Sequence, residues 1–450
     1  MSNELKPLHF DADYTMEEAL AEAKRCLNCP RPLCQMGCPI ENEIPRFIQA
    51  IAHGNFGLAN DILAERTNLP SICGRVCPRE NQCEGNCIMN KAKKPPINIG
   101  KLERFAADFE SINELRKPKK IQQNLGNVAV VGSGPAGLSV AGDMAKLGYK
   151  VTVFEGQSEP GGVLLFGIPE FRLSKSVVRR EIARLEGLGV KFVCNIFIGQ
   201  DKTLDDLFAE GFDSIFIGTG THIPQEVRME NDEVHGVFQA MYLLTNVQLV
   251  ENGDLDESLI PVRKGDRVVI IGGGNVAMDA ARTCVRLGCE SVTVAYRRSQ
   301  EQMPALLSEY EEARAEGVQF QWFASPVAVE GKDKVEGFKY EVMALNEDGA
   351  GIHGTGNYQV MPVDKIIIAA GHKPNARLIG EGNNLKVDEK GYIITSEDPY
   401  GMTNRDGVFA GGDVVHKPAT VVLAMREAKK AVDGMVKYME IKKAQESANQ

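Results

Sequence analysis

The sequence contains a single tryptophan in 450 residues, and aromatic side chains make up only 6% of it. No apolar run reaches the roughly 18 residues that a membrane-spanning helix needs. The first eighteen residues are polar and acidic, which is not the pattern of a secretory signal. We therefore expect a cytoplasmic protein without a membrane span.

An excess of positive charge is also lacking. Lysine and arginine number 51 against 61 aspartates and glutamates, which gives a formal net charge of −10. A nucleic-acid-binding protein would show a basic excess, so this composition disfavours that class. Small anionic ligands still fit, because local clusters can oppose the net sign. The 43% of hydrophobic residues and 25% of charged residues are typical of a globular protein, and the length suggests about three domains.

Eight of the eleven cysteines lie between Cys26 and Cys87. Without a secretory signal, such a dense block predicts metal binding before disulfides. Its first half reads Cys26-x2-Cys29-x4-Cys34-x3-Cys38-Pro39, and its second half reads Cys73-x3-Cys77-Pro78-x5-Cys83-x3-Cys87. Four closely spaced cysteines followed by proline resemble bacterial ferredoxin runs, so the block favours two [4Fe–4S] clusters. Zinc and disulfides are the alternatives. The remaining cysteines, Cys194, Cys284 and Cys289, are expected to be small buried hydrophobes.

The cysteine block lies in a region without strand-like alternation. Thr15-x-x-Glu18 predicts a capping box that opens a helix running through Leu27. Further helices are expected near 44–52 and 56–65. Residues 1–115 therefore predict an all-α domain that needs a metal staple, because its aliphatic content is low for its length. Residues 115–124 read as a linker.

An internal repeat begins at Asn127. A strand, a glycine turn, a helix and a second strand occupy residues 127–154, and the same pattern returns at 268–296. Gly132 pairs with Gly272 and Gly148 with Gly288, both at an offset of 140 residues. The repeat predicts two βαβ nucleotide-binding units in one chain.

The glycine turn of the first unit fits a dinucleotide. Its first glycine makes the turn, its second lets the backbone approach a pyrophosphate, and its third permits close helix packing. An acid ends the second strand, where it can accept bonds from ribose hydroxyls and would repel a 2′-phosphate. The residues concerned are Gly132, Gly134, Pro135, Ala136, Gly137 and Glu155.

The glycine turn of the second unit differs at the strand end. Tyr296 stands where the first unit has its acid, and Arg297 and Arg298 follow. Arginines at this place are what a 2′-phosphate needs, so the second unit should take NADPH. The alternative is a solvated strand end. The turn itself consists of Gly272, Gly274, Asn275, Val276 and Ala277, with Gly273 between the first two.

A third signal lies near the C-terminus. A predicted strand leads into Gly411-Gly412-Asp413, and Thr420 precedes a helix. An aspartate placed after two glycines can meet a sugar hydroxyl of a flavin, and the helix would direct its positive end at the flavin ring.

Taken together, these segments give the chain a strong likeness to a known family. RCLNC, ICGRVCPRENQCEGNC, INIGKLERF, GSGPAGL, PGGVLLFGIPEFRL, IGGGNVAMD and AGGDVV are the matching stretches. The chain resembles the NADPH-dependent glutamate synthase small chains over nearly its whole length. The same module resembles the large subunit of NADH-dependent ferredoxin:NADP oxidoreductase and the N-terminal part of pyrimidine dehydrogenases.

The resemblance implies FAD in the first unit, with Gly162 among its contacts, and NADPH in the second. It also implies which residues hold the two clusters. One set would be Cys26, Cys29, Cys34 and Cys87, and the other Cys38, Cys77, Cys83 and Glu103, where pyrimidine dehydrogenases have a glutamine. Cys73 is left as a neighbour or an alternative ligand. The other interpretation of Glu103 is an exposed helix carboxylate.

The expected architecture is a multidomain α/β protein. An all-α iron–sulfur domain (1–115) precedes two Rossmann-like domains, with the NADPH domain (256–374) inserted in the FAD domain (126–255 and 375–440). The resemblance implies electron transfer from NADPH through FAD and the clusters to a protein partner. That partner would be a glutamate synthase large chain, with no catalytic acid or base required. The alternatives are a ferredoxin-linked transhydrogenase subunit, a pyrimidine dehydrogenase subunit, or a non-enzymatic iron–sulfur scaffold that binds nucleotide.

Overall fold

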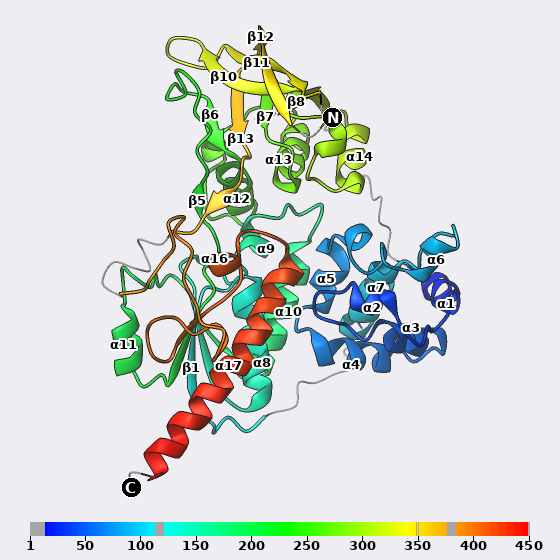
Figure 1. The fold of residues 1–450 in the computed structure, drawn as a ribbon, viewed down its shortest axis with the longest axis vertical. Helices are drawn as coiled ribbons and strands as arrows, with labels where there is room; N and C mark the ends of the chain where they lie inside the picture. The colour runs from blue at the N-terminus through cyan, green and yellow to red at the C-terminus, as the bar shows by residue number, and fades with distance from the viewer. Residues whose placement is uncertain (1–13, 113–120, 348, 350, 376–383, 449–450) are drawn as a thin grey trace. The chain divides into compact units, whose positions relative to one another are not determined.

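The computed structural model describes residues 14–112, 121–347, 349, 351–375 and 384–448 (Figure 1). The chain divides into two compact units. One comprises residues 166–171 and 224–372, and the other comprises the described residues before 166, from 172 to 223 and from 373 onward. Most of the predicted linker at 115–124 lies outside the described residues.

The N-terminal part of the larger unit consists of short helices, and no strand occurs in residues 14–112. The capping box between Thr15 and Glu18 is confirmed. Its helix ends at Lys24, however, so the predicted extension through Leu27 is wrong, and the Leu27 side chain is 63% exposed. The elements are α1 (Met16–Lys24), α2 (Leu33–Met36), α3 (Ile44–Ala52), α4 (Phe56–Arg66), α5 (Pro70–Val76), η1 (Arg79–Asn81), α6 (Ile88–Lys91) and α7 (Ile99–Ile112).

The helices α3, α4 and α7 enclose the core of this cluster domain. Phe47, Ile51 and Leu63 are fully buried there, and the thiols of Cys83 and Cys87 belong to the same core. The sulfur-bearing side chains are therefore part of the packing that holds the domain together.

A five-stranded parallel sheet forms the rest of the larger unit, in the order β15-β4-β1-β2-β3. Figure 1 shows α8 and α17 side by side near β1. The strands are β1 (Asn127–Val131), β2 (Lys150–Phe154), β3 (Lys191–Val193), β4 (Ser214–Ile217) and β15 (Val408–Ala410). The helices are α8 (Pro135–Leu147), α9 (Val163–Phe166), α10 (Lys175–Gly187), α11 (Leu204–Ala209), α16 (Asp413–His416) and α17 (Val421–Ala448).

The smaller unit contains a second parallel sheet, in the order β6-β13-β7-β8-β9. An antiparallel sheet of β10 (Ala324–Glu330), β11 (Gly337–Leu345) and β12 (Ile352–Pro362) follows β9. The parallel strands are β6 (Val237–Gln239), β7 (Arg267–Ile271), β8 (Ser291–Tyr296), β9 (Gln319–Trp322) and β13 (Lys365–Ile368). The helices are α12 (Ala240–Glu251), η2 (Glu257–Leu259), α13 (Asn275–Arg286), η3 (Gln300–Gln302) and α14 (Leu307–Ala315).

The two parallel sheets confirm the predicted repeat. β1 and β2 of the first correspond to β7 and β8 of the second, and each pair encloses one helix after a glycine turn. All strands of the second sheet lie between β4 and β15 in the chain, so the second nucleotide-binding fold is inserted in the first. The short strands β5 (Ile223–Pro224) and β14 (His372–Lys373) mark where the chain passes between the units.

The predicted domain boundary at residue 256 stays a prediction. In the structure, β6 and α12 precede that boundary and already belong to the smaller unit, because β6 pairs with β13. Residues 166–171 also belong to this unit. The Phe171 ring lies 3.8 Å from the Arg286 guanidinium and 4.5 Å from that of Arg282.

No helix in the described part of the chain is both long enough and apolar enough to cross a bilayer.

Candidate functional site

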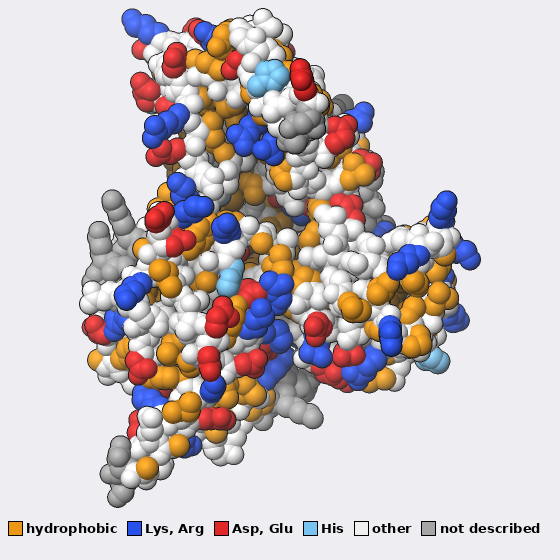
Figure 2. Space-filling view, viewed as in Figure 1, with side chains coloured by type: hydrophobic (Ala, Val, Ile, Leu, Met, Phe, Trp, Pro, Cys, Tyr) orange, Lys and Arg blue, Asp and Glu red, His pale blue; other side chains and the backbone are white. Residues whose placement is uncertain are grey.

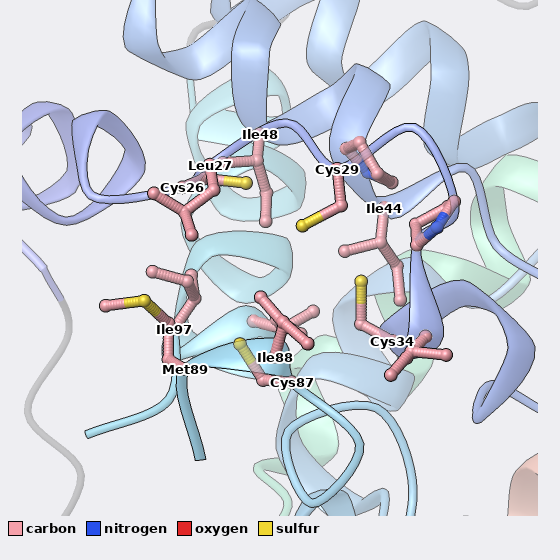
Figure 3. Close-up of a pocket in the computed structure, with 14 residues that line it drawn as sticks. Cys26, Leu27, Cys29, Cys34, Ile44, Ile48, Cys87, Ile88, Met89 and Ile97 are labelled. Atoms are coloured by element: carbon pink, nitrogen blue, oxygen red, sulfur yellow. The ribbon is translucent and has the colours of Figure 1, made fainter. Parts of the chain in front are cut away.

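Four cysteine side chains line one cavity of the cluster domain, and their sulfur atoms face into it (Figure 3). These are Cys26, Cys29, Cys34 and Cys87, the set that the family resemblance implied for one cluster. The other lining residues are all apolar: Leu27, Pro32, Leu33, Ile44, Pro45, Ile48, Ile88, Met89, Ile97 and Ile99. We call these four cysteines the first cysteine set.

The apolar walls make two of these thiols, Cys26 and Cys34, poor acids. Burial raises the pKa of Cys26, and it raises the pKa of Cys34 to about 11. Metal ligation requires thiolates, so a cation at this place would supply the charge that the walls do not. Within the described residues, no three His, Cys, Asp or Glu side chains are placed to hold a single metal ion. The four sulfurs instead surround a space, as the ligands of a cluster do.

Glu103 on α7 is the key residue of the second predicted set. Its side chain is buried, so the alternative of an exposed helix carboxylate is wrong. Asn42 Nδ2 donates to its Oε1 at 3.4 Å. Burial raises the pKa of Glu103 to about 8, against the opposing effect of Arg79. The metal-free carboxyl therefore holds its proton at neutral pH, and ligation would release it.

The three cysteines predicted to join Glu103 all have raised pKa values, and the ionised form of Glu103 contributes to each shift. Burial raises the pKa of Cys38 to about 11 and that of Cys83 well above its usual range, and the Glu103 charge adds to both shifts. The pKa of Cys77 is also raised, first by a hydrogen bond with Cys73 and then by burial and nearby charges, including Glu103. We call Cys38, Cys77, Cys83 and Glu103 the second set. The three cysteines therefore all lie within electrostatic range of Glu103, which is consistent with a shared site.

Cys73 is buried and contacts both the cluster domain and helix α17. Its thiol is 2% exposed and lies 3.9 Å from Thr67 Oγ1 and 3.7 Å from Met425 Sδ on α17. With its hydrogen bond to Cys77, it lies between the second set and the helix that follows the Gly-Gly-Asp turn.

The first glycine turn approaches its neighbours very closely. A Cβ on Gly137 would lie 1.9 Å from the carbonyl oxygen of Gly132, so only glycine fits there. A Cβ on Gly162 would lie 2.9 Å from Gly134 Cα, and one on Gly412 would lie 2.9 Å from Ala136 Cβ. Three separate predicted segments therefore meet at the start of α8.

The start of α8 is open to an anion. Gly134 caps the helix without a side-chain hydrogen bond, and Pro135 follows at its first position. A Cβ on Gly134 would meet nothing within 4 Å. Free N–H groups at a helix N-terminus, next to open space, suit a phosphate group.

Glu155 ends β2 beside this turn and fixes its shape. Glu155 Oε2 accepts hydrogen bonds from Ser133 N at 3.0 Å and Ser133 Oγ at 2.5 Å, and Oε1 accepts one from Gln157 N at 2.9 Å. A carboxylate has about four acceptor positions, so it can still accept a ribose hydroxyl.

Thr219 is a site residue that sequence reasoning missed. It follows β4, and its Cα would lie 3.2 Å from a Cβ on Gly132. Among the described residues its buried hydroxyl has no hydrogen-bond partner, and a bound polar group would supply one. The signal was present as Gly-Thr-Gly directly after a buried strand.

The Gly-Gly-Asp turn places the Asp413 carboxyl in a partly buried position. Gly412 has φ +77°, and Asp413 begins α16. Burial raises the pKa of Asp413 to about 6, while a backbone hydrogen bond to Ala419 lowers it. Thr420 Oγ1 accepts from Leu423 N at 3.4 Å at the start of α17.

The second glycine turn repeats the first in the smaller unit. A Cβ on Gly272 would lie 2.4 Å from the carbonyl oxygen of Ala369, whereas one on Gly274 would meet nothing within 4 Å. Gly274 caps α13 without a side-chain hydrogen bond. Asn275 Oδ1 accepts from Leu306 N at 3.0 Å, and Val276 and the buried Ala277 continue the helix.

The two arginines after β8 are exposed. In the part of the chain that the structure describes, neither Arg297 nor Arg298 forms an ion pair. Tyr296 lies against the glycine turn, since a Cβ on Gly273 would be 2.6 Å from its ring. Its hydroxyl donates to the Gln302 carbonyl at 3.1 Å. The arginine side chains are therefore available to an anion.

Of the three isolated cysteines, only Cys284 is fully buried. Cys194 and Cys289 are partly exposed, so the expectation of buried hydrophobes is wrong for these two. Cys194 directly follows the edge strand β3, and Cys289 follows the end of α13, where solvent reaches the chain.

Two family models match the chain. Residues 6–115 match the one described as dihydropyrimidine dehydrogenase domain II, 4Fe-4S cluster. Residues 126–428 match the one described as pyridine nucleotide-disulphide oxidoreductase. The chain thus joins a 4Fe-4S domain to an FAD- and NAD(P)-binding domain.

Relatives cover nearly the whole chain. The glutamate synthase [NADPH] small chain of Halomonas elongata is 37% identical over 437 residues, which are 95% of this chain and 92% of that protein. The NAD-dependent dihydropyrimidine dehydrogenase subunit PreT of Escherichia coli O157:H7 is 35% identical over 429 residues, which are 94% of each.

A solved structure supports the fold. The oxidoreductase FprA of Mycobacterium tuberculosis superposes with a TM-score of 0.61 at 20% identity, covering 72% of this chain and 86% of that one. At this identity the likeness concerns the fold alone. From the family models and the full-length relatives, we conclude that the chain belongs to the glutamate synthase small chain-like family of NAD(P)H-dependent flavin and iron–sulfur oxidoreductases.

Proposed function

We propose that the chain oxidises NADPH and delivers the electrons to a glutamate synthase large chain. The observation that carries this proposal is the cysteine-lined cavity, which lies in the same compact unit as the first glycine turn. An oxidoreductase that acted only at its flavin would not need such a cavity. When bound, FAD would accept a hydride from NADPH, and the two proposed [4Fe–4S] clusters would carry single electrons onward.

The roles of the protein groups follow from their positions. The open N-termini of α8 and α13 would bind the pyrophosphates of FAD and NADPH respectively. Glu155 and Asp413 would accept hydrogen bonds from sugar hydroxyls of the flavin nucleotide. The first cysteine set and the second set would each hold one cluster, with Cys73 as a neighbour of the second. None of these groups needs to act as a catalytic acid or base.

Coenzyme choice separates this function from a second candidate. The PreT relative is named as a subunit of an NAD-dependent dihydropyrimidine dehydrogenase. In this chain Arg297 and Arg298 are exposed and unpaired among the described residues, at the strand end where a 2′-phosphate would lie. This feature favours NADPH, and with it the glutamate synthase assignment.

The first prediction concerns the two open glycines. Gly134 and Gly274 have extended backbones that alanine can adopt (φ −70° and −94°), and their Cβ positions are empty. Gly134→Ala should weaken FAD binding and Gly274→Ala should weaken NADPH binding, because only the bound pyrophosphate would meet the new methyl group. Overpacking of this kind costs about 1–3 kcal/mol, or roughly 5–150-fold in affinity. Titration of the deflavinated protein with FAD measures the first affinity, and titration of the reduced protein with NADPH measures the second.

Gly57→Ala on α4 is the matched control, since its Cβ would also meet nothing within 4 Å. Unchanged affinities in both glycine variants would show that the nucleotides bind elsewhere.

The second prediction concerns the arginine pair. Each charge-assisted contact with a phosphate contributes about 1.5–3 kcal/mol, so losing one costs about tenfold or more in affinity. Replacing Arg297 and Arg298 together with alanine should raise the KM for NADPH by at least this factor and leave the KM for NADH nearly unchanged. Steady-state kinetics with both coenzymes measure the difference. An equal change for both coenzymes would contradict the proposed role.

The third prediction concerns Glu103. Glu103→Ala should remove one cluster and about four of about eight irons per chain, while FAD stays bound. Glu103→Gln should retain the cluster, because an amide oxygen can replace the carboxylate as a ligand. Iron and acid-labile sulfide analysis with electron paramagnetic resonance provides the measurement.

Glu110→Gln is the control for Glu103, because Glu110 is another buried carboxyl on α7. A full iron count in Glu103→Ala would remove Glu103 from the ligand set. Stoichiometric zinc without labile sulfide would overturn both clusters.

The fourth prediction tests the function as a whole. NADPH should bleach the flavin anaerobically, and glutamate should form from glutamine and 2-oxoglutarate only when a glutamate synthase large chain is added. Cys26→Ser should keep the bleaching and lose glutamate formation. Cys284→Ser, which lies outside both sets, should keep both.

Different failures point to different alternatives. Absence of bleaching would favour a non-enzymatic scaffold. Bleaching with ferredoxin reduction but without glutamate formation would favour a ferredoxin-linked transhydrogenase subunit.

A further inference from the structure

We propose that an acidic redox protein docks on the surface of the cluster domain formed by residues 24–36 and 85–101. We call this surface the basic face. The proposal rests on the proposed function, because it names where the electron-accepting partner binds and what charge that partner carries.

The charge of these two segments opposes that of the whole chain. Residues 24–36 contain Lys24, Arg25 and Arg31, and residues 85–101 contain Lys91, Lys93, Lys94 and Lys101. Neither segment contains an aspartate or glutamate, although the chain has a formal net charge of −10. Two carboxylates from outside the segments lie against them: Glu22 pairs with Arg25 and accepts from Asn98 N, and Glu84 accepts from Gly100 N. Seven cations against these two carboxylates still produce a local positive field, which accelerates the approach of an acidic partner.

The cations that such a partner needs are available. Lys24, Arg31, Lys91, Lys93 and Lys94 are exposed, and none forms an ion pair with a described residue. Elsewhere in the larger unit, cations are often paired, as Lys429 is with Asp143 at 2.7 Å. These five exposed cations can therefore contact a partner without first breaking an ion pair to a described residue.

Arg25 joins the two segments into one surface. Its guanidinium pairs with Glu22 at 2.6 Å and donates to the Pro95 carbonyl at 2.7 Å. Both segments also contribute cysteines to the first cysteine set, so they lie on opposite sides of one cavity.

The centre of the face is apolar. Leu27 lines the cavity of the first cysteine set and is also 63% exposed, so a single side chain reaches from the cavity to the solvent. Figure 2 shows hydrophobic side chains gathered on the cluster domain, with lysines and arginines at their margin. An apolar centre with a charged rim is typical of a protein–protein interface, whereas a phosphate polymer would need only the cations.

The position of the second set indicates that electrons would leave the chain for the partner from the first cysteine set. Cys73 joins the second set to α17 through its 3.7 Å contact with Met425. In the second set Glu103 and Cys83 are buried and Cys38 and Cys77 are partly buried, and in the first set Cys87 is buried and the other three cysteines are partly buried. The cavity of the first set is also lined by Leu27, which is strongly exposed. An acceptor that docks over Leu27 would thus meet the first cysteine set.

Charge reversal on the face tests the proposal directly. The variant carries Lys91→Glu, Lys93→Glu and Lys94→Glu together, and a control carries Lys332→Glu, Lys442→Glu and Lys443→Glu, with the same change in net charge. The probes are an acidic plant-type ferredoxin and basic cytochrome c. At low ionic strength the first variant should bind the ferredoxin about tenfold or more weakly, and the control should bind it like the unaltered chain.

With basic cytochrome c, the variant with three reversed charges on the basic face should bind more tightly than the control. For the unaltered chain, added salt should slow reduction of the ferredoxin and leave that of cytochrome c the same or faster, because screening removes attraction in one case and repulsion in the other. Equal losses in the variant and the control would overturn the basic face and leave only the effect of net charge.

A second pair of variants tests the apolar centre. Leu27→Gln should weaken ferredoxin binding several-fold, with the iron count and visible spectrum unchanged, and Leu58→Gln on α4 should not weaken it. Leu58 is likewise exposed, at 46%, but does not line the cavity. Equal binding by both leucine variants would place the interface elsewhere.

Binding and electron transfer are measured separately, so failure of the docking surface can be distinguished from failure of the proposed function. Ferredoxin binding that depends on Lys91, Lys93 and Lys94 but is not followed by NADPH-driven reduction would uphold the basic face and overturn the electron-transfer function. NADPH-driven reduction that is insensitive to these lysines would uphold the electron-transfer function and overturn the basic face.

Discussion

Burial of ionisable ligands in an apolar shell is the constraint on which the cluster domain depends. The thiols of Cys83 and Cys87 belong to a core of short helices, and the carboxyl of Glu103 is buried in the same domain. Such ligands are costly to ionise without a cation, as the raised pKa values of Cys34, Cys38 and Glu103 indicate. The free energy of cluster binding is therefore also folding free energy for this domain.

The two nucleotide-binding units share a glycine turn, but they differ in whether its third position can accept a side chain. At the third position of the turn, the first unit requires glycine, because a Cβ on Gly137 would lie 1.9 Å from the Gly132 oxygen. The second unit accommodates Ala277 at that position with its side chain fully buried. Both units leave the second glycine open toward the ligand side. On the proposed function, selection between nucleotides would depend on the residues at the end of the second strand of each unit: Glu155 in one, and an exposed arginine pair in the other.

Local patterns were sufficient for most of the fold and for part of the site. The repeat at 127–154 and 268–296, the capping box at Thr15 and the all-α character of the cluster domain follow from periodicity and turn residues, and the structure confirms them. The grouping of the first cysteine set came from family resemblance rather than spacing. The burial of Glu103, the orphan hydroxyl of Thr219 and the placement of residues 166–171 against Arg282 and Arg286 could not be predicted, because each depends on contacts between segments far apart in sequence.

Family membership does not determine the partner, and the structure explains why. Full-length relatives at similar identity include a glutamate synthase small chain and a subunit of a dihydropyrimidine dehydrogenase. The glycine turns and cysteine sets are constrained by cofactors, so partners can impose few differences on them. Differences between partners must instead act on exposed residues that no internal contact requires. In this chain Leu27, Arg31 and the lysines at 91, 93 and 94 are such residues, and they lie on the segments that hold the first cysteine set. On the proposed function, the surface that would select the partner and the site that would serve it are built from the same stretches of chain.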